Sequence, residues 1–150
     1  MKNNKSRNGF TLIELIIVMV ILGIMAAVAV PRYLDSISNA EEAAEDAVIS
    51  AIKSGLTQYA NNSLYESGRA EWPFNPFDAL AEKPVGYSNE DADAYNDGMW
   101  TYNSFGNGDG NITHQRGDNS RYKWSYSAGK QGGGDDAGIG TLGEREKITY

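Results

Sequence analysis

The sequence has no cysteine and one histidine, His114, among its 150 residues. Without cysteine there is no disulfide framework, no thiolate metal site and no cysteine nucleophile. One histidine excludes a multi-histidine metal site within one chain, and it leaves Ser-His-Asp catalysis with a single available base. We therefore interpret His114 as a surface or hairpin-face residue and expect that the protein is not an enzyme.

Basic residues are scarce as well. The chain has 13 Lys and Arg against 20 Asp and Glu, and three of the basic residues lie within the first nine positions. The remaining sequence is therefore strongly acidic, whereas binding to a phosphate backbone needs a basic surface. We expect no nucleic-acid partner. The length accommodates one membrane segment and one small globular domain.

One long apolar run is present. Residues 10–30 form a run of 21 residues that contains a single charge, Glu14. A membrane-spanning helix needs roughly 20 apolar residues, and a carboxylate near its centre costs about 2.5–3.5 kcal/mol, so Glu14 should have a role or a partner. The leader, residues 1–9, is polar and basic, which predicts a cytoplasmic N-terminus and a C-terminal bulk outside the cytoplasm.

Three interpretations of this run compete. A permanent membrane anchor fits its length. A conventional cleaved secretion signal fits the basic start and the A-x-A-like triplet at residues 27–29, but the run is longer than the usual core of roughly 7–15 residues and contains a charge. The third interpretation rests on a resemblance.

Residues 9–15, of sequence G-F-T-L-I-E-L, comprise the last residue of the leader and the start of the apolar run. In this position they closely resemble the signature of type IV pilins and type II secretion pseudopilins. The resemblance implies that a prepilin peptidase cuts after Gly9 and that the new terminal residue, Phe10, is N-methylated. It also implies that Glu14 pairs with the terminal amine of a neighbouring subunit during assembly. The alternative is a carboxylate that serves nothing.

Helix geometry is compatible with that pairing. Glu14 follows Phe10 by four residues, about 6 Å along a helix, and an amine beside it would neutralise a charge that burial penalises. The resemblance implies as partners identical or homologous pilin subunits, the prepilin peptidase/N-methyltransferase, an inner-membrane assembly platform and membrane lipid. The implied location is the inner membrane before assembly, and then an extracellular pilus or a periplasmic pseudopilus.

The pattern predicts one helix over residues 10–61. Its first half, 10–30, is apolar all round, and its second half, 31–62, is amphipathic, with apolar residues at spacings of three and four. We expect a kink at Gly23 and Pro31, because proline removes a helical hydrogen bond. Four acidic residues are expected on the faces away from the apolar stripe: Glu41, Glu42, Glu45 and Asp46.

The remaining residues, 63–150, are expected to form an extracytoplasmic head. Trp72, Phe74 and Phe77 lie in an irregular tract and are interpreted as core anchors, with a ligand-binding aromatic patch as the alternative. Strands are predicted over 99–103, 112–116 and 121–127, separated by turn-rich segments. The predicted fold class is α+β, with the long N-terminal helix packed on a small antiparallel sheet of about three strands.

Two further segments suggest ligands. Residues 132–138, within the glycine-rich and loop-like tail 128–143, resemble the calcium-associated end of major secretion pseudopilins, which implies Asp135 and Asp136 as calcium ligands. The alternative is a solvated acidic loop, and no other cofactor is expected. Residues 107–111 lack the flanking carboxylates of an EF-hand and predict a hairpin turn instead. Asn111 begins an N-x-T glycosylation acceptor.

The leading hypothesis is a structural subunit of a type IV pilus-like filament, processed after Gly9 and assembled by helix packing. A type II secretion pseudopilin is the alternative within the same class. A secreted or membrane-anchored glycan- or calcium-binding module is the alternative from another class.

Overall fold

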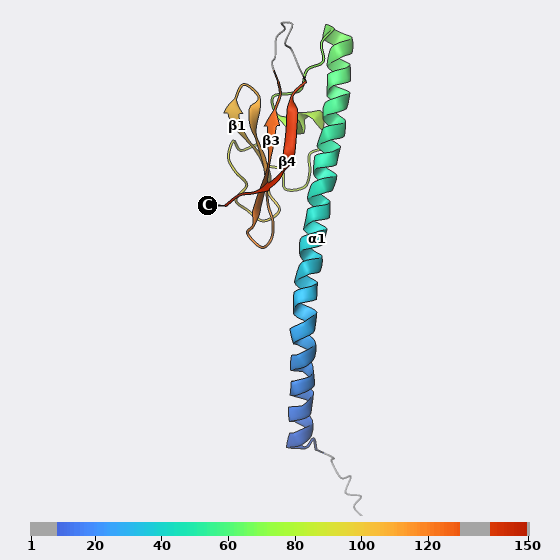
Figure 1. Cartoon of the computed structure of the whole chain (residues 1–150), viewed down its shortest axis with the longest axis vertical. Helices are drawn as coiled ribbons and strands as arrows, with labels where there is room; N and C mark the ends of the chain where they lie inside the picture. The colour runs from blue at the N-terminus through green and yellow to red at the C-terminus, as the bar shows by residue number, and fades with distance from the viewer. Residues whose placement is uncertain (1–8, 130–138, 150) are drawn as a thin grey trace, which may run out of the picture. The chain divides into compact units, whose positions relative to one another are not determined.

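The computed structural model describes residues 9–129 and 139–149. These residues form a long helix, a short 3₁₀ helix and a sheet (Figure 1), with bounds α1 (Leu12–Ser67), η1 (Pro76–Ala79), β1 (Trp100–Gly106), β2 (Asp109–Gln115), β3 (Arg121–Ser127) and β4 (Thr141–Lys147). The chain divides into two compact units, Met1–Glu42 and Ala43–Tyr150. From here on, the head means the second unit, Ala43–Tyr150, which includes the C-terminal part of α1 as well as the predicted head, 63–150.

Helix α1 begins two residues after the expected start and continues through Gly23 and Pro31. The kink expected at these two residues stays a prediction. A Cβ added to Gly23 would meet no atom within 4 Å, so no neighbouring group in the described chain requires glycine there.

The helix ends at Ser67, six residues later than expected. The following residue, Gly68, has φ 76°, and its backbone N–H donates to the Leu64 carbonyl at 2.9 Å. This left-handed glycine is a common C-terminal helix cap. The cap therefore determines the end of α1, and the Asn-Asn-Ser segment at 61–63 remains helical.

The sheet is antiparallel with strand order β1-β2-β3-β4. β1 and β2 are joined through Asn107 and Gly108, which have φ values of 55° and 81°. Two successive positive φ values are typical of the tightest hairpin turns, so the predicted hairpin is confirmed. Among the described residues the sheet has one strand more than expected, because β4 begins within the glycine-rich tail, 128–143, for which the sequence predicts a loop.

The core of the head lies between the sheet and the C-terminal part of α1. Ile52, Leu56, Phe77 and Ile112 are completely buried. The other members of this core are Ile49, Trp100, Tyr102, Trp124, Tyr126 and Ala128. The predicted α+β fold class, a long N-terminal helix packed with an antiparallel sheet, is confirmed.

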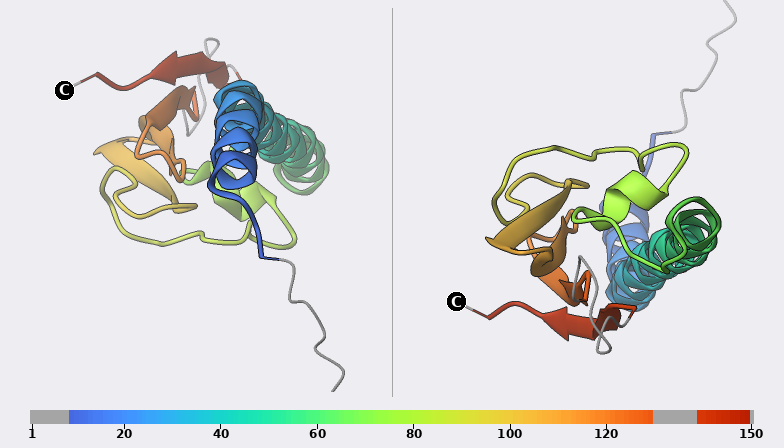
Figure 2. Two further views of the ribbon diagram at one scale, coloured as in Figure 1. Left: turned by 90° about the horizontal axis from the view of Figure 1, so that it is seen from below. Right: turned by 90° about the horizontal axis from the view of Figure 1, so that it is seen from above.

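The segment between η1 and β1 covers the β1 edge of the sheet (Figure 2). Trp100 donates its backbone N–H to the Gly86 carbonyl at 3.0 Å and accepts from the Ser88 N–H at 2.9 Å. On the face away from α1, the buried hydroxyl of Thr101 donates to the Ala92 carbonyl at 2.6 Å, and that of Thr113 accepts from the Ala94 N–H at 2.8 Å. Both faces of β1 and β2 are therefore covered within the head.

Candidate functional site

The predicted cleavage residues lie just before α1. Gly9 and Phe10 are not helical, and the Phe10 side chain is 90% exposed. A Cβ on Gly9 would meet no atom within 4 Å among the described residues. The peptide bond between Gly9 and Phe10 is therefore accessible in the described chain, and its cleavage and the methylation of Phe10 stay predictions.

Glu14 forms a capping box with Thr11 at the start of α1. The Thr11 N–H donates to Glu14 Oε2 at 2.8 Å, and the Glu14 N–H donates to Thr11 Oγ1 at 3.3 Å. The Thr11 hydroxyl also donates to Oε2, at 2.8 Å. Such reciprocal bonds satisfy amide groups that have no partner within the helix. This capping role of Thr11 was not predicted above, although T-x-x-E at a helix start is the usual sequence signal of a capping box.

The first part of α1 has an apolar surface that the chain does not cover. The large side chains from Leu12 to Val30 are 46–76% exposed. The helix is long and apolar enough to cross a membrane by length and composition, a test that signal sequences also pass. In the described residues, Glu14 is the only carboxylate before Asp35, so the polar group at the start of this surface is isolated.

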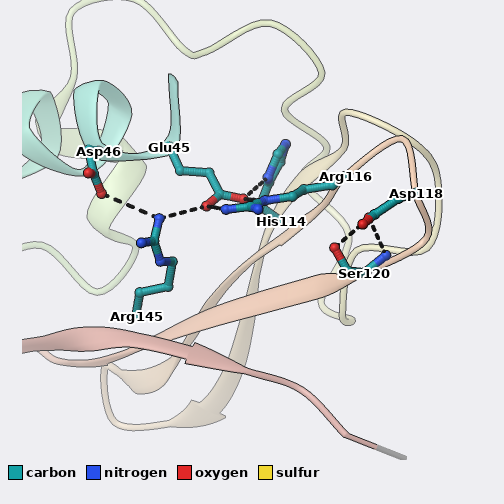
Figure 3. Close-up of polar contacts among 7 residues, drawn as sticks. All are labelled: Glu45, Asp46, His114, Arg116, Asp118, Ser120 and Arg145. Atoms are coloured by element: carbon teal, nitrogen blue, oxygen red, sulfur yellow. Dashed lines mark hydrogen bonds and ion pairs between the residues drawn. The ribbon is translucent and has the colours of Figure 1, made fainter. Parts of the chain in front are cut away.

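A second polar cluster lies inside the head, around Glu45 (Figure 3). Arg116 binds the carboxylate in a bidentate manner, with Nε to Oε1 at 2.8 Å and Nη2 to Oε2 at 2.6 Å. His114 Nδ1 lies 2.9 Å from Oε1, and Arg145 Nη1 lies 3.2 Å from Oε2. These four bonds fill the acceptor capacity of the carboxylate. Glu45 thereby connects α1 to strands β2 and β4.

Aromatic rings support the groups that bind Glu45. Trp100 stacks on the His114 ring with centroids 4.3 Å apart. The Arg116 guanidinium lies 4.1 Å from the centre of the Tyr122 ring. Because an ionised carboxylate can only accept, His114 must carry a proton on Nδ1 to bond with it. Of the two interpretations of His114, the surface residue is wrong, because the residue is 8% exposed. The hairpin-face residue is confirmed, because His114 lies on β2 opposite Trp100 of β1, with its Nδ1 atom bonded to Glu45.

The cluster keeps Glu45 ionised in spite of complete burial. Burial raises the pKa of the Glu45 carboxyl, but the hydrogen bonds from Arg116 and His114 and the charge of Arg116 outweigh it and lower the pKa to about 2. A buried charge of this kind requires its partners, because removing one leaves an uncompensated ion. The expectation that Glu45 lies away from the buried face of the helix is therefore wrong. Arg116 and Arg145 compensate its charge.

The residues predicted to bind calcium and the residue predicted to be glycosylated lie in different parts of the chain. Asp135 and Asp136 lie outside the described residues. Within 9–129 and 139–149, no group of three or more His, Cys, Asp or Glu side chains could hold a metal ion. Asn111 is half-buried on β2 opposite Asn103 and Ser125, and Thr113 of the same acceptor triplet is completely buried. Glycosylation at Asn111 stays a prediction.

The sequence of the N-terminal segment matches a known family model. Residues 4–30 match the model described as the prokaryotic N-terminal methylation motif. The match covers the predicted cleavage position, the Thr11–Glu14 capping box and the exposed apolar surface. The predicted resemblance of this segment to prepilin-type proteins is confirmed.

Curated relatives extend the match beyond the motif. The chain is 42% identical over 72 residues to a fimbrial protein of Neisseria meningitidis, covering 48% of this chain and 39% of that protein. It is 54% identical over 46 residues to the type IV narrow pilus major component PilA5 of Thermus thermophilus, covering 31% and 40%. It is 36% identical over 83 residues to the type II secretion system core protein G of Pseudomonas aeruginosa, covering 55% of each.

These alignments span about half or less of the length of the relatives. No solved structure matches the chain significantly. The sequence comparisons therefore show that the N-terminal segment is similar to that of type IV pilins and secretion pseudopilins.

Proposed function

We propose, from the prepilin-type N-terminal segment as premise, that the protein is a structural subunit of a type IV pilus-like filament. A prepilin peptidase would cut it after Gly9 and N-methylate Phe10, and subunits would then pack through α1. The observation that carries the proposal is the match of residues 4–30 to the N-terminal methylation motif. The fimbrial and pilus proteins among the relatives support it.

The exposed apolar surface of the first unit supports assembly by helix packing. Contiguous apolar surfaces of this size mark membrane or protein contacts. Membrane lipid would cover the surface in the free subunit, with the N-terminus in the cytoplasm, and neighbouring copies of α1 would cover it in the filament. Apolar helices then associate by close packing and by the pairing of the few polar groups present.

Glu14 is the polar group that would specify this packing. Both bonds from Thr11 reach Oε2, and Oε1 remains as an acceptor for a further donor. In the processed chain, the amine of Phe10 on a neighbouring subunit would supply that donor and a compensating positive charge. This pairing would be formed only in the filament, so it would favour assembly without affecting insertion.

The terminus of the mature protein tests processing. Mass spectrometry should find a chain that begins at N-methylated Phe10, and Gly9→Leu should leave the full-length chain, whereas the matched small substitution Gly9→Ala should still be cut. A mature terminus at Val30 would instead indicate a conventional secreted protein, and one at Met1 a simple anchor. Either result would contradict the proposal.

Assembly is tested separately through Glu14. We expect Glu14→Ala to insert into the membrane at the normal level and to yield at least tenfold fewer sheared filaments. Asp35→Ala removes another exposed carboxylate of the same helix and is the matched control. Normal filament yield from Glu14→Ala would reject the proposed pairing.

A type II secretion pseudopilin is the second candidate, because the Pseudomonas core protein G aligns over a larger share of both chains than the fimbrial relatives do. Its filament would remain in the periplasm. Electron microscopy of cells that express the protein at its natural level distinguishes the two, since only a pilus subunit gives surface fibres. Neither candidate is an enzyme, and the assembly platform would be an inner-membrane partner of both.

A further inference from the structure

A small pocket lies on the head at the β1 side of the sheet, away from the polar cluster around Glu45. Its volume is about 220 Å³, below the roughly 300–1,000 Å³ of sites for drug-sized ligands. It therefore suits a ligand of about one ring. The lining residues are Phe74, Asn75, Asn89, Asp91, Tyr102 and Ser104.

Two side chains in this pocket retain hydrogen-bonding capacity of opposite kinds. Asn89 accepts the Tyr87 hydroxyl on Oδ1 at 3.1 Å, which leaves its amide N–H groups as donors. Asp91 accepts the Ser104 backbone N–H on Oδ1 at 2.6 Å, which leaves Oδ2 as an acceptor. Each side chain is thereby held by one hydrogen bond within the head. The lining of the pocket therefore presents both a donor and an acceptor.

Tyr102 adds a buried hydroxyl that lacks a partner. The residue is 7% exposed, and its hydroxyl makes no hydrogen bond of normal geometry with a described residue, although the Ser104 side chain is close to it. Burial and the charges of Asp109 and Asp91 raise the pKa of Tyr102 to about 12. The hydroxyl therefore stays protonated. The hydroxyl oxygen has almost no exposed surface, so it lies behind the pocket lining and does not face the ligand.

Phe74 supplies an apolar surface at the same pocket. Of the three aromatic residues interpreted as core anchors, Phe77 is completely buried and Trp72 stacks on Tyr126, but Phe74 is 59% exposed. Its ring lies against the β1–β2 turn, where a Cβ on Gly108 would come within 2.9 Å of Phe74 Cδ1. The ring is therefore exposed but supported. The interpretation as a core anchor is wrong for Phe74.

We propose that this pocket binds a neutral saccharide unit, with neighbouring hydroxyls on Asn89 and Asp91 and the C–H face of the sugar ring on Phe74. Neighbouring hydroxyls of a sugar both donate and accept, which matches a pocket lining that offers a donor and an acceptor. A purely apolar ligand would leave these groups unpaired. An anionic sugar would be repelled by Asp91 and the acidic Glu90 and Asp93 beside it in the chain.

The test uses the full-length chain in phosphocholine micelles, because glycosidic detergents would themselves compete for the pocket. Saturation-transfer NMR titrations with methyl glycosides of mannose, galactose, glucose and N-acetylglucosamine should give saturable binding of at least one, with a Kd of roughly millimolar for a ligand this small in an open pocket. N-acetylneuraminic acid, which is anionic, should bind more weakly than the best neutral glycoside.

Two pocket variants connect the binding to the pocket. Asp91→Asn keeps an acceptor for the Ser104 N–H, and it should weaken binding at least tenfold, as should Phe74→Ala. Tyr102→Phe should leave binding unchanged because its hydroxyl does not face the ligand, and the unfolding midpoint should stay equal or rise, since an unpaired hydroxyl is removed. Phe105→Ala is the matched control, because this aromatic residue is 66% exposed and does not line the pocket.

The proposal is overturned if no neutral glycoside shows saturable binding, if the pocket variants bind like Phe105→Ala, or if the anionic sugar binds most tightly. The measurement uses unassembled subunits, so its result is independent of the filament proposal. Asp91→Asn should assemble normally, and Glu14→Ala should bind the glycoside normally.

Discussion

Apolar residues of α1 are exposed in the first unit of the chain and buried in the head. Ile17 in the first unit is 51% exposed, whereas Ile52 in the head is completely buried, and both lie on α1. The head encloses its apolar side chains with its own sheet. The first unit has no such cover within the described residues, which is why we propose membrane lipid and neighbouring copies of α1 as its cover.

Two glutamates of α1 show the same contrast, because one carboxylate is exposed and the other is buried. Glu14 is exposed and is held by a single neighbouring residue, Thr11. Glu45 is completely buried and is held by side chains from two strands of the sheet. The first carboxylate is therefore available to an outside partner, and the second is fully used inside the head.

The largest effect should come from removing the buried carboxylate. Glu45→Ala removes the carboxylate that Arg116, His114 and Arg145 bind inside the head, and it should lower the free energy of unfolding of the head by about 3–5 kcal/mol. Asp46→Ala should change it by less than about 1 kcal/mol, because the Asp46 side chain is 68% exposed. Urea unfolding followed by tryptophan fluorescence measures both, and similar losses would contradict the assigned role of Glu45.

Two isoleucine-to-alanine substitutions compare the buried apolar core of the head with the exposed apolar surface of the first unit. Ile52→Ala creates a cavity in the core and should cost the head about 2–5 kcal/mol. Ile17→Ala should leave the unfolding free energy of the head within about 0.5 kcal/mol of its original value. The same unfolding assay applies, and a large loss from Ile17→Ala would show that the first unit is needed for the stability of the head.

Acid should weaken the head through Glu45. The folded pKa is about 2 against an ordinary value of 4.5, so the stabilisation is complete above about pH 4.5 and is lost as the pH falls toward 2. The loss should be about 3 kcal/mol. Unfolding of Glu45→Gln, which cannot titrate, should depend less on pH over this window. Parallel pH profiles for the two proteins would refute the expectation.

The smallest effect should come from the start of α1. Thr11→Ala removes the cap and should destabilise the first turn by about 1 kcal/mol, whereas Thr11→Ser keeps the hydroxyl. Amide hydrogen exchange of Glu14 and Leu15, whose N–H groups bond to Thr11, should accelerate roughly fivefold in Thr11→Ala only. The head should unfold as before. Equal exchange rates in the two variants would show that the capping box adds no stability.

The sequence predicted the parts of the fold that depend on periodicity. The helix, its apolar stripe and strand β3 follow from regular spacing of residues such as Ile52, Leu56, Trp124 and Tyr126. The motif at Gly9–Glu14 was recognisable because its residues are neighbours in the chain. Its confirmed resemblance therefore needed no knowledge of the tertiary structure.

The features that escaped prediction depend on contacts between distant segments. Glu45 reads as a surface residue because its partners His114 and Arg116 are about 70 positions away. β4 has the sequence T-L-G-E-R-E-K, whose charges are typical of an exposed edge strand and hide the alternation of a buried one. The pocket at Phe74 likewise depends on how residues 74–104 fold back on β1.

The bond between Arg145 and Glu45 joins positions 100 residues apart. Contacts of this separation form late and slow the folding of a domain, because a long loop must close first. A chain that ends before β4 would lack Arg145 and would bind the buried Glu45 carboxylate with one cation fewer. The last strand of the sheet therefore completes the charge compensation of a residue on the helix with which the head begins.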